Sequence, residues 1–227
     1  MKRVAFLVDG FNLYHSVVQA ECDNGGHCVK WLDLGRLCLS FLHLVRRAVN
    51  DQVEMETIRY FSATPTHYPV GTQNRHALYM DCLKATGVDV QLGRFKEKTV
   101  KCRQCHQDDT RHEEKETDVA MGAQLLEIGH SDEADTVVMV TGDTDLAPAV
   151  RTCRRLFPTM PVYFAFPYRR HNEELEHLCP GSFNIRRRSY LRHQYLNPLA
   201  LPDGTVFNRP PEWDPPAPLP PITTPTT

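Results

Sequence analysis

The acidic residues that could do chemistry follow two apolar runs of the sequence. Asp143 and Asp145 come directly after the β-forming run Val137–Val140, and Asp9 follows a second run at residues 3–8. Short apolar runs of this kind are typical of buried parallel strands, and ligands bind at the carboxyl ends of such strands. Because close carboxylates repel each other, the pattern indicates a site for a divalent cation, either Mg²⁺ or Mn²⁺.

Two further residues lie where they could join this site. Asp118 falls in the first turn of a predicted helix whose N-cap is expected to be Thr117, and that helix leads toward the strand before Asp143. Asn12 lies where a helix would begin after Asp9, close enough to hold the Asp9 side chain or a phosphate oxygen. Both residues are therefore expected beside the acidic edge of the sheet.

A purely structural explanation of these polar residues stays open at this point. Asp143 would then cap the helix that follows it, and Asp145 would be a first-turn acid favoured by the helix dipole. Asn12 would be the N-cap of a helix from Leu13 onward, which is compatible with a role in the site.

The elements that must position these residues alternate along the chain. We expect strands at residues 3–8, 54–63, 88–95, 136–140, 161–166 and 182–185. Helical patterns lie between them, at residues 31–49, 74–86, 117–128 and 172–178 and also after residues 12 and 145. Such alternation predicts an α/β fold, a three-layer α/β/α domain with a mainly parallel sheet.

Residues 96–114 interrupt this rhythm, because they are basic and polar and lack an apolar period. The stretch holds one Cys-x-x-Cys motif and two nearby histidines, namely Cys102, Cys105, His106 and His112. Two thiolates and two imidazoles could bind Zn²⁺. A second Cys-x-x-Cys motif is missing, however, and a flexible basic loop is the alternative interpretation.

The C-terminal part combines basic and aromatic residues before a proline-rich tail. Guanidinium and ammonium groups suit phosphate contacts, and the candidates for RNA binding are Lys96, Lys98, Arg186, Arg187 and Arg188. A solvated C-terminal helix is the alternative for the arginine run. Residues 197–227 contain ten prolines and are expected to be disordered or polyproline-like.

Composition limits the class of protein. A chain of 227 residues that is 41% hydrophobic suits one medium-sized domain with appendages, and its net charge of −2 neither demands nor excludes a polyanionic partner. No apolar run reaches the length of a membrane span, and the N-terminus does not resemble a signal peptide. The cysteines lack a disulfide framework, so a reducing, cytoplasmic location is expected.

Three short motifs occur in order along the chain: Asp9-Gly10-x-Asn12, Thr117-Asp118-Val119-x-Met121 and Thr141-Gly142-Asp143-x-Asp145-Leu146. Together they resemble the NYN domain, the LabA-like branch of the PIN-like nuclease superfamily, over about residues 1–188. The insertion at 96–114 and the extension at 189–227 fall outside the common pattern. The resemblance implies a Rossmann-like fold with an Mg²⁺- or Mn²⁺-binding acidic pocket. The metal-binding acids of the family match Asp9, Asp118, Asp143 and Asp145, and its neighbouring polar residues match Asn12 and Thr141.

These observations predict a metal-dependent ribonuclease that hydrolyses RNA phosphodiester bonds. An alternative is a catalytically weak RNA-binding or scaffolding module of the same fold. A phosphatase of the haloacid-dehalogenase type would need a second acid two positions after Asp9, where this chain has Phe11. RNA is the expected partner and a membrane is not, while self-association into a homo-oligomer stays open.

Overall fold

The computed structural model describes residues 1–101 and 108–214, without the side chains of residues 101–115. Within this part, seven strands form one sheet in the order β4-β3-β2-β1-β5-β6-β7. All neighbours are parallel except β3 and β4. The strands are β1 (Lys2–Asp9), β2 (Val53–Thr64), β3 (Asp89–Lys101), β4 (Asp108–Lys115), β5 (Thr136–Val140), β6 (Val162–Phe166) and β7 (Phe183–Asn184).

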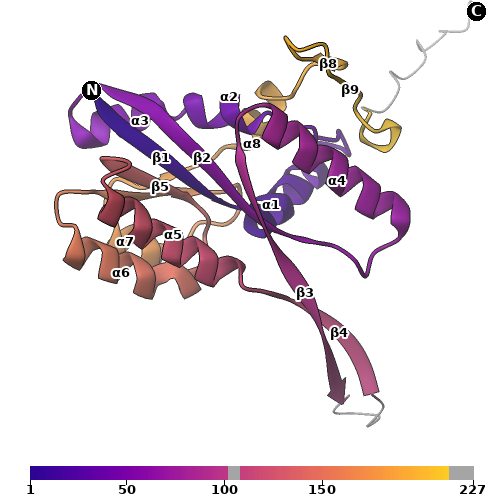
Figure 1. Ribbon diagram of the computed structural model, residues 1–227, viewed down its shortest axis with the longest axis horizontal. Coiled ribbons are helices and arrows are strands. Elements are labelled where there is room, and N and C mark those ends of the chain that lie inside the picture. Colours follow the sequence, from indigo (N-terminus) through magenta and orange to yellow (C-terminus); the bar gives the residue numbers. More distant parts are fainter. Residues whose placement is uncertain (102–107, 215–227) are drawn as a thin grey trace, which may run out of the picture.

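Helices cover both faces of the sheet (Figure 1). One layer contains α1 (Gly10–Cys22), α2 (Leu34–Leu39), α3 (Leu42–Val49), α4 (Val70–Ala85) and α8 (Arg187–Arg192). The other contains α5 (Thr117–Ser131), α6 (Ala147–Leu156) and α7 (Glu173–Leu178). The predicted three-layer α/β/α fold with a mainly parallel sheet is therefore confirmed.

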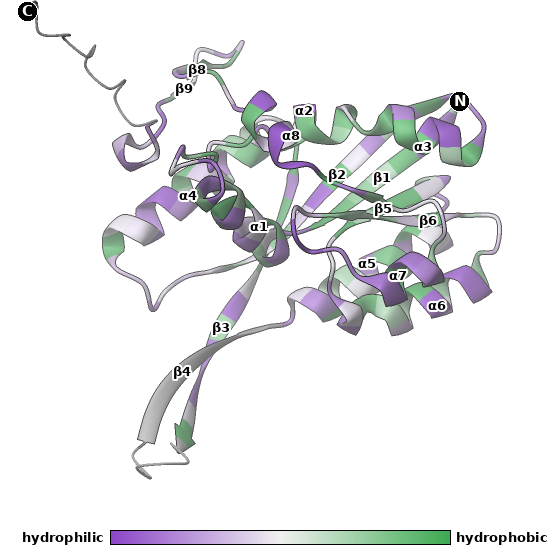
Figure 2. Ribbon diagram, turned by 180° about the vertical axis from the view of Figure 1, so that it is seen from behind, coloured by the Kyte–Doolittle hydropathy of each residue, from purple (hydrophilic) through white to green (hydrophobic). Residues whose placement is uncertain are grey.

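The central strands explain why both faces need covering. Along β1, Val4, Phe6 and Val8 pack into one core cluster, whereas Ala5 and Leu7 pack into the other. Because successive side chains of a strand point to opposite faces, a strand with helices on both sides is apolar throughout. Figure 2 shows this strand coloured as hydrophobic along most of its length.

Two elements differ from the sequence expectation. The predicted helix at 31–49 is two helices, α2 and α3, which are separated at Ser40 and Phe41. The expected loop at 96–114 is largely a hairpin: β3 continues to Lys101 and pairs with the antiparallel strand β4. This hairpin projects away from the rest of the sheet (Figure 1), so neither of its faces needs the apolar alternation by which strands are recognised.

The C-terminal region also differs from the expectation of disorder. Residues 197–214 form a short β-ribbon, β8 (Leu199–Ala200) with β9 (Val206–Phe207), and a 3₁₀ helix, η2 (Pro211–Trp213). Trp213 packs against the rings of Trp31 and Tyr79, with centroids 6.2 and 6.3 Å away. Contact among these aromatic rings holds the segment against the domain, although it is rich in proline. The residues after 214 lie outside the described part.

No helix in the described ranges is both long and apolar enough to cross a membrane.

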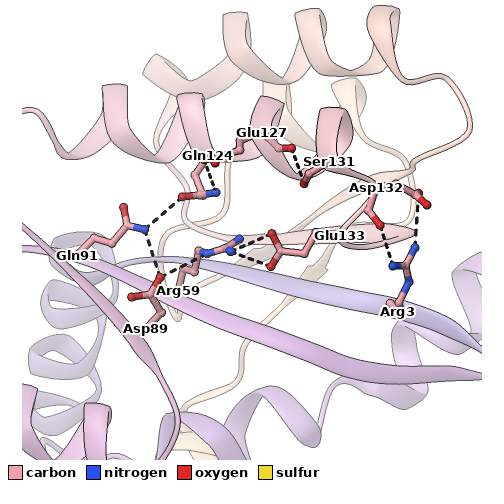
Figure 3. A network of polar contacts seen from close by, with 9 residues as sticks. All are labelled: Arg3, Arg59, Asp89, Gln91, Gln124, Glu127, Ser131, Asp132 and Glu133. Carbon is pink, nitrogen blue, oxygen red and sulfur yellow. Dashed lines mark hydrogen bonds and ion pairs between the residues drawn. The ribbon is translucent and has the colours of Figure 1, made fainter.

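A polar network holds α5 against the sheet (Figure 3). Arg59 of β2 donates from Nη2 to both carboxylate oxygens of Glu133, just after α5, at 2.7 and 2.9 Å. Its Nε lies 3.4 Å from Oδ2 of Asp89 at the start of β3. Gln91 of β3 donates to Oε1 of Gln124 in α5 at 3.2 Å. The network fixes the helix that carries Asp118.

We expect Arg59→Ala to lower the free energy of unfolding by about 2 kcal/mol, because two carboxylates lose a largely buried partner. The matched control is Arg151→Ala, which removes an equally short but exposed ion pair with Glu174, and it should cost less than about 1 kcal/mol. Urea denaturation of the two variants measures both effects. Equal losses would contradict a structural role for the Arg59 network.

Candidate metal centre

The three acids of the predicted site converge at the carboxyl edge of the sheet. Asp9 is the last residue of β1, and Asp143 follows β5, the parallel neighbour of β1. Asp118 comes from the first turn of α5. Carboxylate oxygens of Asp9, Asp118 and Asp143 all lie within 4.8 Å of one another. The fold thus brings Asp9 together with two acids that lie more than a hundred positions later in the chain.

Asp9 is buried and both of its oxygens accept hydrogen bonds. Oδ1 accepts from the backbone N–H of Asn12 at 2.9 Å, and Oδ2 accepts from the hydroxyl of Thr141 at 2.8 Å. Asp9 is therefore the N-cap of α1, which begins at Gly10, and the interpretation of Asn12 as the N-cap was wrong. A strand that leads directly into a helix leaves its last carboxylate in reach of the free N–H groups of the first turn.

The side chains of Thr141 and Asn12 join the two strand ends. The fully buried Thr141 hydroxyl also accepts from the N–H of Asp143 at 3.1 Å. The side-chain oxygen of Asn12 accepts from the N–H of Gly142, also at 3.1 Å. Both residues lie beside the acids as expected, but these contacts hold the carboxylates in place.

Asp143 and Asp145 have different environments. Asp143 caps the 3₁₀ helix η1 (Thr144–Leu146) by accepting from the N–H of Asp145 at 3.0 Å, so the capping interpretation is confirmed. A capping carboxylate still has a second oxygen for a ligand. Asp145 is exposed and lies outside the group of three, although its charge acts on Asp118.

The N-terminus of α5 differs from the predicted arrangement. The N-cap is Glu116, in a left-handed conformation with φ of 81°, and Thr117 is the first helical residue. No side-chain cap forms there, and the buried Thr117 hydroxyl has no hydrogen-bond partner among the described residues. Instead, Arg94 of β3 holds the Glu116 carboxylate at 2.7 Å. The base of the hairpin is thereby in contact with the residue that precedes α5, although the ion pair is exposed and contributes little to stability.

Crowding of the acids changes their proton affinities. Burial raises the pKa of Asp118 to about 6, and repulsion from Asp9, Asp143 and Asp145 contributes in the same direction. Burial also raises the pKa of Asp9, although hydrogen bonds from Asn12 and Thr141 oppose this. Within the ranges that the structure describes, no lysine or arginine forms an ion pair with Asp9, Asp118, Asp143 or Asp145. The negative charge of the cluster is therefore not compensated by the described part of the chain.

This donor set fits a hard divalent cation. The cluster offers carboxylate oxygens from Asp9, Asp118 and Asp143 and neither thiolate nor imidazole. Oxygen ligands of this kind suit Mg²⁺ and Mn²⁺, and a cation among them would replace repulsion with attraction. The geometry thus matches the metal chemistry expected from the sequence, with Asp145 outside the group of three.

A close backbone approach shapes the loop that carries Asp143. A Cβ atom on Gly142 would lie 1.9 Å from the carbonyl oxygen of Arg170, which follows β6. Gly10, beside Asp9, is similarly constrained, because its Cβ would lie 2.6 Å from the carbonyl oxygen of Phe61. The motif glycines are therefore required by packing of neighbouring segments.

The other predicted site residues lie elsewhere. Lys96 and Lys98 are exposed on the projecting strand β3. Arg186, Arg187 and Arg188 lie at the start of α8, where Arg187 donates to the carbonyl oxygen of Asp23. Asp23 caps the far end of the 13-residue helix α1, about 20 Å along the helix from Asp9. Of the zinc candidates, Cys102, Cys105 and His106 lie outside the described residues, as does the side chain of His112.

Sequence reasoning missed several residues that border the site. Arg94 and Glu116 form an exposed ion pair at the start of α5, and the ring of Phe11, two residues after Asp9, contacts the ring of Phe95. The one sequence signal for these residues is their position: Phe11 comes soon after a strand end, and the others lie next to the basic stretch at 96–114.

We expect Asp118→Asn to stabilise the metal-free protein at pH 7.5. The pKa of Asp118 is about 6 in the folded protein and near 3.8 in the unfolded chain. Between pH 3.8 and pH 6, the folded protein therefore binds a proton at Asp118 that the unfolded chain does not. The stability conferred by the protonated form is therefore present below pH 4 and lost as the pH rises through 6. Thermal denaturation in EDTA from pH 4 to 8 should show a higher Tm for the variant only at the upper end.

The control for this measurement is Asp81→Asn, which removes an exposed acid of α4 and should follow wild type at every pH. Added Mn²⁺ should raise the Tm of wild type at pH 7.5 and have little effect on Asp118→Asn. A variant that is less stable than wild type at pH 7.5 in EDTA would rule out repulsion at this carboxylate.

Comparison with known proteins identifies the family of this chain. No curated protein matches the chain at a significant level. Among solved structures, a protein of unknown function from Vibrio parahaemolyticus is similar, with 20% sequence identity and a TM-score of 0.46, over 82% of this chain and 93% of that one. Among protein-family models, the NYN domain matches residues 3–184, which include every acid of the centre. The chain therefore belongs to the NYN domain family of PIN-like nucleases.

Proposed function

We propose that this protein is a metal-dependent ribonuclease that hydrolyses RNA phosphodiester bonds. The observation that carries the proposal is the convergence of Asp9, Asp118 and Asp143 within 4.8 Å, without a compensating lysine or arginine in the described ranges. Membership of a nuclease family supports the reaction class. RNA as the substrate is our inference from the family resemblance of the three motifs.

Each residue of the candidate centre would have a distinct role. Asp9, Asp118 and Asp143 would hold Mg²⁺ or Mn²⁺, which when bound supplies charge neutralisation and a more acidic water for phosphodiester hydrolysis. Thr141 and Asn12 keep two of these carboxylates aligned through the contacts described above. Asp145 is exposed beside the cluster and can accept a hydrogen bond from water.

We expect Asp143→Asn to lower metal-dependent cleavage of RNA by roughly a hundredfold, because the cluster loses one charged ligand. Asp145→Asn should cost roughly tenfold, since Asp145 lies outside the group of three. The control Asp81→Asn should cleave like wild type. The assay uses a panel of RNA and DNA substrates with Mg²⁺, Mn²⁺ or EDTA.

The same assay separates the alternatives. Structured RNA that binds equally to wild type and Asp143→Asn, with no cleavage by wild type in Mn²⁺, would indicate an RNA-binding or scaffolding module. Free phosphate released from small phosphomonoesters would indicate a phosphatase.

Lys96 should contribute to RNA affinity through a phosphate contact. Its side chain is exposed on β3. Lys96→Ala should therefore lower the slope of log Kd against log salt concentration by about 0.7, the value for one contact with a single strand. Lys84→Ala, at the exposed end of α4, is the control and should leave the slope unchanged. If the slope is unchanged for both variants, Lys96 does not contact an RNA phosphate.

A further inference from the structure

Four aromatic side chains, Phe11, His67, Tyr68 and Phe95, contact one another near the start of α1, and we call them the aromatic rim. The rings of Phe11 and Phe95 meet edge to face with centroids 5.5 Å apart. His67 lies 4.5 Å from Phe95 and 4.3 Å from Tyr68. The rim therefore joins the start of α1, the loop between β2 and α4, and the base of the hairpin.

The aromatic rim is not part of the protein core. Phe11, Tyr68 and Phe95 do not belong to the hydrophobic core clusters of the described residues. Tyr68 is 52% exposed, whereas Phe11, His67 and Phe95 are half-buried. Rings that touch one another and still face water are available for contact with a ligand.

The rim is connected to the elements that carry two acids of the candidate centre, Asp9 and Asp118. Phe11 lies two residues after Asp9, and its backbone N–H helps to lower the pKa of that acid. Phe95 is on the same face of β3 as Gln91, because the two are four residues apart along a strand. The Gln91 side chain binds Gln124 of α5, the helix that opens with Asp118. The rim is therefore built on α1, which begins after Asp9, and on β3, which contacts the helix that carries Asp118.

We propose that the aromatic rim is a nucleobase-binding subsite, whose rings stack on unpaired bases of the bound RNA. The inference rests on the proposed ribonuclease function and adds to it a set of residues that would bind bases. Aromatic rings stack on any exposed base, whereas the faces of bases within a duplex are already covered by their neighbours. Lys96, which follows Phe95 directly, supplies a positive charge for the backbone phosphates.

These features favour RNA over a protein partner. The rim is continuous with a site whose acids need a cation and whose family acts on nucleic acid. Stacking surfaces with adjacent basic residues are the usual means by which proteins hold single strands. Tyr68 is the member to test, because its side chain is exposed and its backbone contacts to Pro65 and Gln73 do not depend on the ring.

The experiment measures binding in an Asp143→Asn background, so that cleavage does not intervene. Three fluorescent probes are compared by anisotropy: an unstructured 12-nucleotide RNA, its duplex, and a strand of equal length with abasic positions. Adding Tyr68→Ala should weaken binding of the unstructured RNA roughly tenfold and change the other two little. Adding Tyr68→Phe should retain the affinity.

Leu156→Ala is the matched control, because Leu156 is 53% exposed but lies near Lys2 at the opposite edge of the sheet. It should not affect any of the three probes. As a second measurement, the fluorescence of Tyr68→Trp should be quenched by the unstructured RNA and not by the abasic strand.

Equal losses on all three probes, or no loss on the unstructured RNA, would overturn the proposal. So would a Tyr68→Ala variant that loses self-association while its RNA affinity is unchanged, since that result would make the rim a protein-binding surface. Because binding is measured without cleavage, these outcomes are independent of whether wild type proves to be a nuclease.

Discussion

Mutual repulsion among three carboxylates is the constraint on which the site depends. Asp9, Asp118 and Asp143 would separate if their backbones were free to move, and a surface loop would let them do so. Here Asp9 is anchored as the last residue of a central strand, with both oxygens occupied by hydrogen bonds. The stability of the rest of the domain is what keeps the negative charges close enough to attract a cation.

The two strand-end acids and Asp118 are held by different means. Asp9 and Asp143 are placed by the parallel register of β1 and β5 and by the Thr141 hydroxyl that joins them. Asp118 depends on α5, which the Arg59 network fixes near its C-terminus. At its start, α5 follows the hairpin directly through the left-handed residue Glu116, so the hairpin is continuous with one side of the candidate metal centre.

The sequence was sufficient to predict most of the sheet, because strands that are buried on both faces, such as β1 and β5, are apolar at successive buried positions. It also predicted that Asp9 and Asp143 would meet, since both follow such strands. It was not sufficient for β4 or for the part of β3 beyond Phe95, because this ribbon lacks an apolar face. The capping role of Asp9 and the place of Trp213 depend on tertiary contacts that local propensity does not contain.

The close approach of Gly142 to the Arg170 carbonyl has an evolutionary consequence. The glycine of the third motif has an ordinary backbone conformation, so it is the loop after β6 that excludes a side chain there. Relatives with a longer or differently folded loop at this point would be free to carry alanine or serine in the motif. Variation at the motif glycine should therefore track changes in a segment almost thirty residues downstream, and not changes in the chemistry of the acids.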